Sequence, residues 1–272
     1  MGDASYDYRN YEGGGYFDFV PTRLVDATFS ETASDDTLTD YDGDGIAEIP
    51  VGRLPVRTVA EANVVISKIV NFLPANVPQS ALMVADTQGT YFFNFEQANE
   101  QLIPLLTLAM QANVQKVYRA QQPSDPAARA NIISKINAGT ALVNYSGHGN
   151  VDVWTGAPIF NTTDAMALTN GNKLPLVIVM NCLNGYFIAP PIDCVSEALM
   201  KNPNGGAVAS FSSSGETIPI GQQEMGLRLF TLLYSGTPIA LGDATRQAKV
   251  ATTDLDVRRT WILFGDPTMK IR

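Results

Sequence analysis

Apolar residues along this chain follow two alternating patterns. Short, nearly continuous apolar runs, typical of buried strands, occupy segments 80–88, 113–120, 140–146, 173–181 and 206–213, and segment 47–56 is expected to be extended. Between them, apolar residues recur at helical spacing in segments 58–73, 95–111, 125–139, 195–206, 221–236 and 241–253, and segment 261–271 closes the chain. Strands that alternate with helices of this length predict βαβ units and a mostly parallel central sheet flanked by helices.

Local signals support two of the predicted helix ends. Thr58 is followed three residues later by Glu61, which is the spacing of a capping box. Gly139 follows the helical segment 125–138 and predicts its end. Residues 1–45 are rich in Gly, Asp, Tyr and Ser and predict loops and short edge strands. We therefore expect two parts.

The first part, residues 1–56, is a loop-rich segment and the remnant of an N-terminal subdomain. The second, residues 57–272, is the main domain. The opening string MGDASYDY lacks the basic and apolar regions of a secretory signal. It reads like the end of a strand, which suggests an excerpt from a longer precursor.

Composition narrows the class of protein. With 272 residues, the chain can bury the core of one large α/β domain or two small ones. A net charge of −9 argues against nucleic-acid binding, which requires a basic surface. No apolar run reaches the roughly 18 residues of a membrane span, so we expect no direct insertion into a bilayer. Two cysteines do not make a disulfide framework.

The chain has a single histidine, and its position is informative. His148 comes just after the strand-like run 140–146, and Cys182 comes just after the run 173–181. Ligands of open parallel sheets bind beyond the carboxyl ends of strands, where both side chains would emerge. This pairing suggests a cysteine peptidase. A structural histidine and an inert buried cysteine remain open alternatives.

The chemistry of such a pair follows from the thiol pKa. A free thiol is only a few per cent thiolate near neutral pH, and an imidazole within reach raises that fraction and can later protonate the leaving amine. The tetrahedral oxyanion then needs hydrogen-bond donors. The backbone N–H groups of Cys182 and Gly149 are the best candidates because each lies beside one of the reactive side chains.

Longer strings resemble a known family. NYSGHGN with a following Trp154, then LTNGNKLPLVIVMNCLNGYF, CVSEALM and GGAVAS, are similar to the gingipain-like C25 cysteine peptidases. DYDGDGIAEIPVGRLPVRTVAEA and FGDPTMKI also resemble that family, so the similarity runs from Gly2 to Ile271. The resemblance implies a caspase-like α/β fold: a three-layer sandwich with a mostly parallel central sheet. It also implies that Cys182 is the nucleophile and His148 the base.

The resemblance implies further roles. An acidic residue at the end of an earlier strand, here Asp86, would orient His148, with Asp152 as the rival. Cys194 matches a family position that is not the nucleophile, and a buried helix thiol is expected there. Glu197, in the same block, is expected near a helix end or loop.

The family also suggests a basic P1 residue in the substrate. Glu216 or Glu96 could supply the charge of the pocket, although each could equally be a solvated surface carboxylate. Trp154 is assigned to substrate binding with them. Segment 211–225 lacks the tryptophan of the Arg-specific members, which puts arginine specificity in doubt.

The wider biology is also implied only by the resemblance. It suggests a secreted or cell-surface bacterial enzyme that acts on peptides or proteins, and a propeptide or further domains in the precursor. One family branch passes the acyl group to an amine, so a sortase-like transpeptidase is an alternative to hydrolysis. A non-catalytic binding domain with the same fold is a third.

The string TDYDGDGIAE suggests a calcium loop. Asp40, Asp42 and Asp44 stand at alternate positions before Gly45, as in the first half of an EF-hand. The twelfth position is Val51, which excludes a full EF-hand, but Glu48 at the ninth could contribute. We expect no cofactor for catalysis itself, and a structural Ca²⁺ competes with a plain Asp/Gly-rich turn. One His and two Cys do not supply the ligands of an ordinary zinc site.

Overall fold

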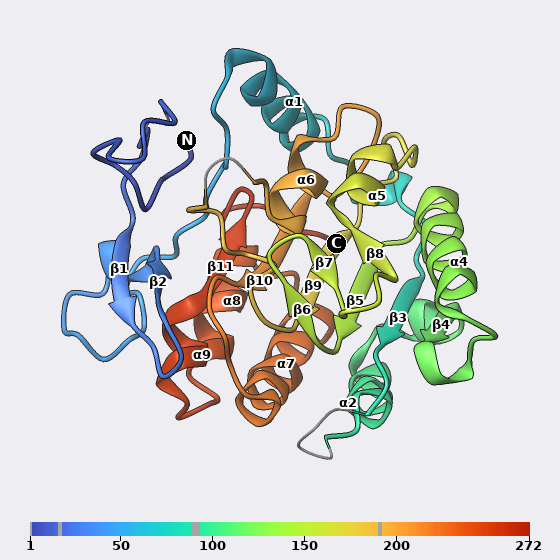
Figure 1. Ribbon diagram of the computed structural model, residues 1–272. Coiled ribbons are helices and arrows are strands. Elements are labelled where there is room, and N and C mark those ends of the chain that lie inside the picture. Colours follow the sequence, from blue (N-terminus) through green and yellow to red (C-terminus); the bar gives the residue numbers. More distant parts are fainter. Residues whose placement is uncertain (1, 16–17, 89–92, 190–191) are drawn as a thin grey trace.

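A six-stranded sheet forms the centre of the molecule (Figure 1). The computed structural model describes residues 2–15, 18–88, 93–189 and 192–272. The strand order is β11-β10-β9-β5-β3-β4, with every neighbouring pair parallel except β10 and β11. The strands are β3 (Ala81–Ala85), β4 (Val114–Tyr118), β5 (Leu142–Ser146), β9 (Leu176–Met180), β10 (Ala209–Ser213) and β11 (Trp261–Phe264). The mostly parallel sheet that the sequence predicts is confirmed.

Helices cover both faces of this sheet. The principal helices are α1 (Val59–Val70), α2 (Phe95–Leu102), α3 (Leu108–Gln111), α4 (Asp125–Ala138), α5 (Thr162–Ala167), α6 (Val195–Lys201), α7 (Pro219–Tyr234), α8 (Leu241–Lys249) and α9 (Leu255–Thr260). Short 3-10 turns are η1 (Asp36–Leu38), η2 (Pro74–Asn76), η3 (Ile103–Leu105) and η4 (Arg119–Gln121).

The alternation of side chains along the strands separates two hydrophobic layers. On β3, Met83 packs into the layer formed with α2, α7 and α8, whereas Leu82 and Val84 face the layer formed with α4, α5 and α6. Both layers are closed to solvent, since β3, β5 and β9 are buried along their whole length. The three-layer α/β sandwich predicted for the chain is therefore confirmed.

The N-terminal segment packs on the β11 side of the sheet (Figure 1). Its strands β1 (Arg23–Asp26) and β2 (Glu31–Ser34) form an antiparallel pair. Arg53 forms a parallel bridge with Phe264 of β11, and Ala33 and Val56 join a third hydrophobic cluster that includes Phe264. Residues 1, 16 and 17 of the predicted segment 1–56 lie outside the described residues, and its separate origin stays a prediction.

Some predicted elements were wrong in their extent. The single helix expected over 95–111 is broken into α2, η3 and α3, because Pro104 cannot supply the N–H that an uninterrupted helix needs. The helix expected over 195–206 ends at Lys201, shortly before Pro203. The sequence reading missed α5, α9 and a small sheet. That sheet consists of β6 (Gly149–Asn150), β7 (Val153–Trp154) and β8 (Phe160–Asn161).

Among the described residues, we find no helix that combines the length and the apolarity needed to cross a bilayer. The central sheet positions the loops that carry the candidate reactive residues. Strands β3, β5 and β9 run parallel, so their carboxyl ends meet at one edge, from which the loops carrying Asp86, His148 and Cys182 leave.

Candidate active site

The loops that carry His148 and Cys182 start side by side. Ser146, the last residue of β5, is in register with Met180, the last residue of β9. The backbone N–H of Gly147 donates to the carbonyl of Met180 over 3.1 Å. Each reactive residue follows its strand by two positions, so the topology brings the two loops together as the sequence predicts.

The glycines on either side of His148 allow its loop to pack closely against its neighbours. A Cβ atom on Gly149 would lie 2.0 Å from Asn181 Nδ2 and 2.9 Å from the carbonyl oxygen of Cys182. A Cβ atom on Gly147 would lie 2.5 Å from Asp86 Cβ. A side chain at Gly149 would force the two reactive loops apart, and one at Gly147 would collide with Tyr145 and Asp86, so the absence of a Cβ on both sides of His148 is a steric requirement of this arrangement.

The imidazole of His148 lies on the solvent side of the site. The residue is exposed, and its ring meets the ring of Phe95 edge-on, with 5.3 Å between centroids. Its backbone carbonyl accepts hydrogen bonds from the Tyr145 hydroxyl over 2.6 Å and from the Thr155 N–H over 3.0 Å. The backbone of His148 is therefore fixed, while its side chain faces the space above the sheet edge.

Asp86 is buried directly beside this loop, with 2% of its surface exposed. One carboxylate oxygen accepts from Arg119 Nη1 over 2.9 Å and from the backbone N–H of Thr87 over 2.7 Å. The other lies 3.4 Å from the backbone N–H of His148. Its contact with His148 is thus to the backbone. Arg119 is held in turn by Asp125 over 2.6 Å.

Asp152, the rival acid, occupies the exposed turn between β6 and β7. Its backbone carbonyl accepts from the N–H of Thr162 over 3.0 Å.

Cys182 is half-buried. Its Sγ lies 3.5 Å from the carbonyl oxygen of Thr217. Burial raises the pKa of the thiol, and the negative charge of Glu216 raises it further. The next residue, Leu183, has a left-handed backbone with a φ of 65°, which is uncommon outside glycine and indicates local strain. A thiol with a raised pKa is protonated at rest and needs a base to become a nucleophile.

The three residues expected to bind substrate lie in different places. Glu216 is exposed and close enough to Cys182 to affect its pKa. Glu96, at the start of α2, accepts a hydrogen bond from Gln121 over 2.7 Å, beside β4. Trp154 is fully buried and stacks on Tyr145 with 4.4 Å between ring centroids. Its expected place at a substrate surface is corrected: the indole belongs to the core beneath the hairpin.

The second cysteine is enclosed. Cys194 has no exposed surface and caps the N-terminus of α6, where its backbone N–H donates to Glu197 over 3.0 Å. Burial raises the pKa of this thiol well above its usual value. Glu197 is also fully buried and pairs with Lys201 over 2.9 Å. Of the two thiols, Cys182 is the one that solvent reaches.

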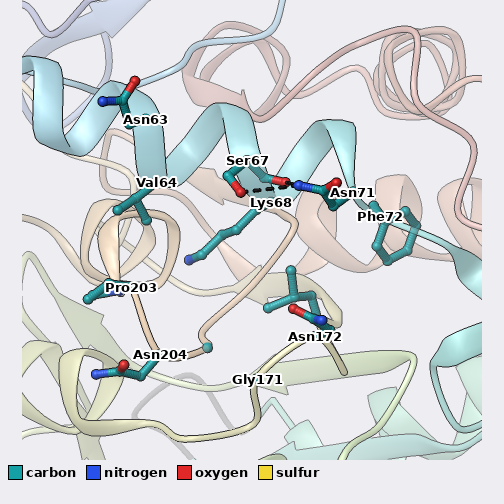
Figure 2. A pocket seen from close by; sticks show the side chains of 12 residues that line it. Asn63, Val64, Ser67, Lys68, Asn71, Phe72, Gly171, Asn172, Pro203 and Asn204 are labelled. Carbon is teal, nitrogen blue, oxygen red and sulfur yellow. Dashed lines mark hydrogen bonds between the residues drawn. The ribbon is translucent and has the colours of Figure 1, made fainter.

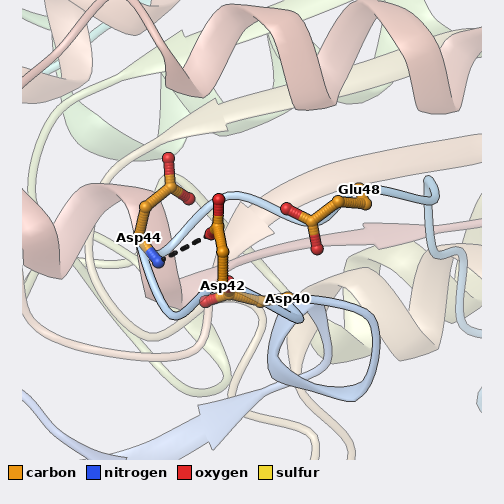
Figure 3. A group of neighbouring side chains, drawn as sticks. All are labelled: Asp40, Asp42, Asp44 and Glu48. Atoms are coloured by element: carbon orange, nitrogen blue, oxygen red, sulfur yellow. Dashed lines mark hydrogen bonds between the residues drawn. The ribbon is translucent and has the colours of Figure 1, made fainter.

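The acidic loop gathers the four predicted oxygen ligands. Asp40, Asp42, Asp44 and Glu48 place one carboxylate oxygen each within 4.8 Å of one another (Figure 3). The loop is folded by its own carboxylates, since Asp40 accepts from the N–H groups of Gly43 and Gly45 over 2.8 and 3.0 Å. These are hard oxygen donors, the kind that Ca²⁺ prefers.

A large cleft lies away from these loops and is lined by α1 residues (Figure 2). It has a volume of about 850 Å³ and runs between α1 and the loops that lead into β9 and β10, at the amino ends of those strands. Lys68 lines it and donates to the carbonyls of Leu199 and Met200 over 3.0 and 2.7 Å. Burial lowers the pKa of Lys68 to about 7. The volume of a cleft therefore does not identify the reactive site here.

Sequence reasoning missed several residues that shape the site. Arg119 binds Asp86, Thr217 contacts the thiol, and Asn181 and Asn184 flank Cys182. The asparagines were visible in the string MNCLNG, where two amides beside a reactive thiol suggest a hydrogen-bonded turn. Arg119 gave no such signal, because it follows a different strand.

Comparisons with known proteins identify similar chains. A sequence model described as Peptidase family C25 matches residues 1–272. Gingipain R2 of Porphyromonas gingivalis is 30% identical over 182 residues, which is 62% of this chain and 24% of the relative. Gingipain R1 of the same species is also 30% identical over 182 residues, which is 62% of this chain and 18% of the relative. The chain thus spans about a quarter or less of these curated relatives.

Solved structures agree. The crystal structure of the Arg specific cysteine proteinase gingipain R matches with a TM-score of 0.78 and 25% identity, covering 100% of this chain and 63% of that one. A complex of the Porphyromonas gingivalis RgpB pro- and mature domains matches with a TM-score of 0.77 and 25% identity, covering 88% and 61%.

Proposed function

Because the chain belongs to peptidase family C25, we propose that it is a cysteine peptidase domain in which Cys182 is the nucleophile and His148 the base. One observation carries the assignment: the loops after the neighbouring parallel strands β5 and β9 are in contact, and each bears one of the two reactive side chains. Peptide or protein is the substrate, and the reaction needs no cofactor.

In the proposed reaction, His148 takes the proton from Cys182 Sγ as the sulfur attacks the carbonyl carbon of the scissile peptide bond. The tetrahedral intermediate collapses, the C–N bond breaks, and the imidazolium gives its proton to the leaving amine. His148 then removes a proton from water, which attacks the thioester and releases the acid and the thiol. The raised pKa of Cys182 supports the need for this base.

The N–H groups of Gly149 and Cys182 are proposed to bind the oxyanion. Gly149 is opposite Trp154, and the neighbouring bond from Thr155 N–H to the His148 carbonyl marks this as a non-hydrogen-bonded pair of the hairpin. The Gly149 N–H therefore points out of the ladder, toward the side where a substrate carbonyl can reach it. Such a donor is typically worth roughly 3 kcal/mol.

We assign Asp86 the role of orienting His148, and it does so by holding the backbone of the loop that carries the histidine. Its buried carboxylate lies beside the His148 backbone N–H and is anchored by Arg119. The exposed position of Asp152, at the tip of the hairpin, favours it less.

We propose that the substrate carries a basic residue at P1, because Glu216 places a negative charge near the thiol. Its carboxylate is exposed, yet it acts on the pKa of Cys182, so a lysine or arginine bound next to the thiol would meet this charge. Glu96 is the weaker choice because its carboxylate already accepts a hydrogen bond from Gln121. Gingipain R is described as Arg specific.

The acidic loop is proposed to hold a structural Ca²⁺ through Asp40, Asp42, Asp44 and Glu48. The convergence of four carboxylate oxygens supports it. Thermal unfolding should shift up by several degrees with excess Ca²⁺ over chelator, since ligand at about 100 times Kd contributes roughly 2.7 kcal/mol. The same scan on Asp42→Asn should lose this shift; a shift that persists would refute the site.

We also propose a secreted or cell-surface bacterial location and control by a propeptide. The resolved pro- and mature domain complex of RgpB supports the second point. The location and the propeptide are proposed for the longer protein to which this domain would belong.

Hydrolysis of fluorogenic peptides with Lys or Arg at P1 tests the function. Cys182→Ala and His148→Ala should each abolish turnover and leave the thermal unfolding temperature close to that of the wild type. Cys194→Ala, which removes the enclosed thiol, is the matched control and should remain active. Full activity of Cys182→Ala would overturn the proposal.

A further inference from the structure

Asn184 joins the loop that carries Cys182 to the hairpin that carries His148. The side chain is fully buried, and its amide Nδ2 donates to the backbone carbonyls of Asn150 and Val153, the latter over 3.2 Å. These carbonyls belong to β6 and β7, immediately after His148. We propose that Asn184 is a positioning residue that fixes the distance between the thiol and the imidazole; this inference rests on the proposed function.

The same side chain also fixes its own loop. Its Oδ1 accepts from Asn181 Nδ2 over 2.6 Å, across Cys182. The backbone N–H of Asn184 donates to the carbonyl of Cys182 over 2.9 Å. Cys182 is therefore flanked by two asparagines whose side chains are hydrogen-bonded to each other. This turn holds Leu183 in its left-handed backbone conformation.

A third contact ties the turn to the helical layer. The backbone carbonyl of Asn184 accepts from the N–H of Ser196, in the first turn of α6. Asn184 thus links the nucleophile loop, the histidine hairpin and α6. Neither β5 nor β9 can do this, because both strands end before the reactive residues and their ladder sets only where the loops begin.

The consequence for chemistry is geometric. The thiol and the imidazole come from separate loops, so their separation depends on the bonds that join those loops. A misplacement of about 1 Å can cost roughly 100-fold in rate. Loss of the amide would also remove the two side-chain bonds that join the hairpin carbonyls to the turn, which favours movement of the hairpin away from the turn.

Asn202 offers a matched control. It is likewise fully buried, and its Nδ2 donates to two backbone carbonyls, those of Ala165 and Leu168, over 2.8 and 2.9 Å. It follows the C-terminal end of α6, whereas Asn184 contacts the first turn of that helix. Replacing it removes the same kind of bonds far from the thiol.

The experiment compares Asn184→Ala and Asn184→Asp with Asn202→Ala. For each variant we would measure kcat and KM on a peptide substrate, the thermal unfolding temperature, and the pH dependence of iodoacetamide alkylation at Cys182. Asn184→Asp keeps the shape of the side chain and its acceptor oxygen, and removes the donor.

Both Asn184 variants should lower kcat about 100-fold and leave KM within about threefold, and the alkylation profile should move to higher pH because the imidazole no longer assists the thiol. Asn202→Ala should lower the unfolding temperature without changing kcat or the profile. Unchanged kcat and profile in the Asn184 variants, or an equal loss in Asn202→Ala, would overturn the proposal. Failure of both Asn184 variants to fold would also overturn it, by assigning the residue to folding.

Different results would contradict the proposed peptidase function and the positioning role of Asn184. If Cys182→Ala still cleaves peptide, the proposed function is wrong. If Cys182→Ala is inactive while the Asn184 variants keep wild-type kinetics and alkylation, only the positioning role is wrong.

Discussion

Gly149→Ala adds one methyl group at the point where the two reactive loops touch. The new Cβ would lie 2.0 Å from Asn181 Nδ2, against 3.4 Å for ordinary contact. The backbone of Gly149 has no left-handed φ, so alanine meets no conformational obstacle there. The perturbation is therefore steric, and it acts directly on the residue next to Cys182.

The size of the effect follows from that overlap. Relief requires a movement of about 1.4 Å, the difference between those two distances. Asn181 cannot easily supply it, because the residue is fully buried and its amide is bonded to Asn184 over 2.6 Å. The loops must separate instead. Since misplacement by about 1 Å can cost roughly 100-fold in rate, we expect kcat to fall at least about 100-fold. Overpacking should cost about 1–3 kcal/mol of stability.

Steady-state kinetics on a fluorogenic peptide and a thermal unfolding scan measure the two effects. Gly156→Ala is the control: it lies shortly after β7, and a Cβ there meets nothing within 4 Å. It should keep wild-type kcat. A folded Gly149→Ala protein with kcat within about threefold of the wild type would refute the steric account, because that overlap would then have been absorbed without moving the site.

Three further predictions concern charge and chemistry. Glu216→Gln should lower the pKa of Cys182 and reduce kcat/KM about five- to tenfold for substrates with Lys or Arg at P1, with little change for a neutral P1 residue; equal losses for both substrates would exclude Glu216 from the pocket. Glu197→Gln should flatten the pH dependence of stability. Burial raises the pKa of Glu197 to about 8 in the folded protein, whereas the unfolded chain loses this proton above about pH 4.5. The stability of the wild type therefore falls as the pH rises between these two values. Denaturant titrations across that window check it, and an unchanged slope would contradict it. Product analysis by mass spectrometry in the presence of an added amine should give mainly the hydrolysed acid; a dominant amide product would favour the transpeptidase.

The central sheet could be predicted from the sequence because its strands are buried on both faces. Segments such as LVNYS and LVIVM are almost continuous apolar or small-residue runs, and their spacing with helices requires parallel pairing. The positions of His148 and Cys182 at the strand ends followed from the same logic. The approach of the two loops was expected from the sequence, but the glycine that permits it could be weighed only once the neighbouring atoms were known.

Other features depend on contacts that no local pattern encodes. Trp154 follows the histidine closely in sequence, which suggested a role at the substrate, yet the hairpin turns its ring under the loop to stack on Tyr145. The hairpin strands are only two residues long and carry no periodicity. Asp86 could be located at a strand end, but its pairing with Arg119 joins residues 33 positions apart. Tertiary packing, and not propensity, decides such pairings.

The break in the predicted helix 95–111 is a different kind of error. Pro104 is visible in the sequence, and its effect on a helix interior is a local rule. The helical spacing of the apolar residues outweighed it in the prediction. The result is a short α2, whose first residue, Phe95, contacts the ring of His148.

The central claim is that Cys182 forms a covalent acyl intermediate with the help of His148. Mass spectrometry of the protein, quenched with acid during turnover of a peptide ester and then mapped by digestion, tests it most directly. The account predicts an acyl adduct on the peptide that contains Cys182, none on the peptide that contains Cys194, and strongly reduced formation in His148→Ala. An adduct on Cys194, or turnover without any adduct on Cys182 under conditions that preserve a thioester, would contradict it.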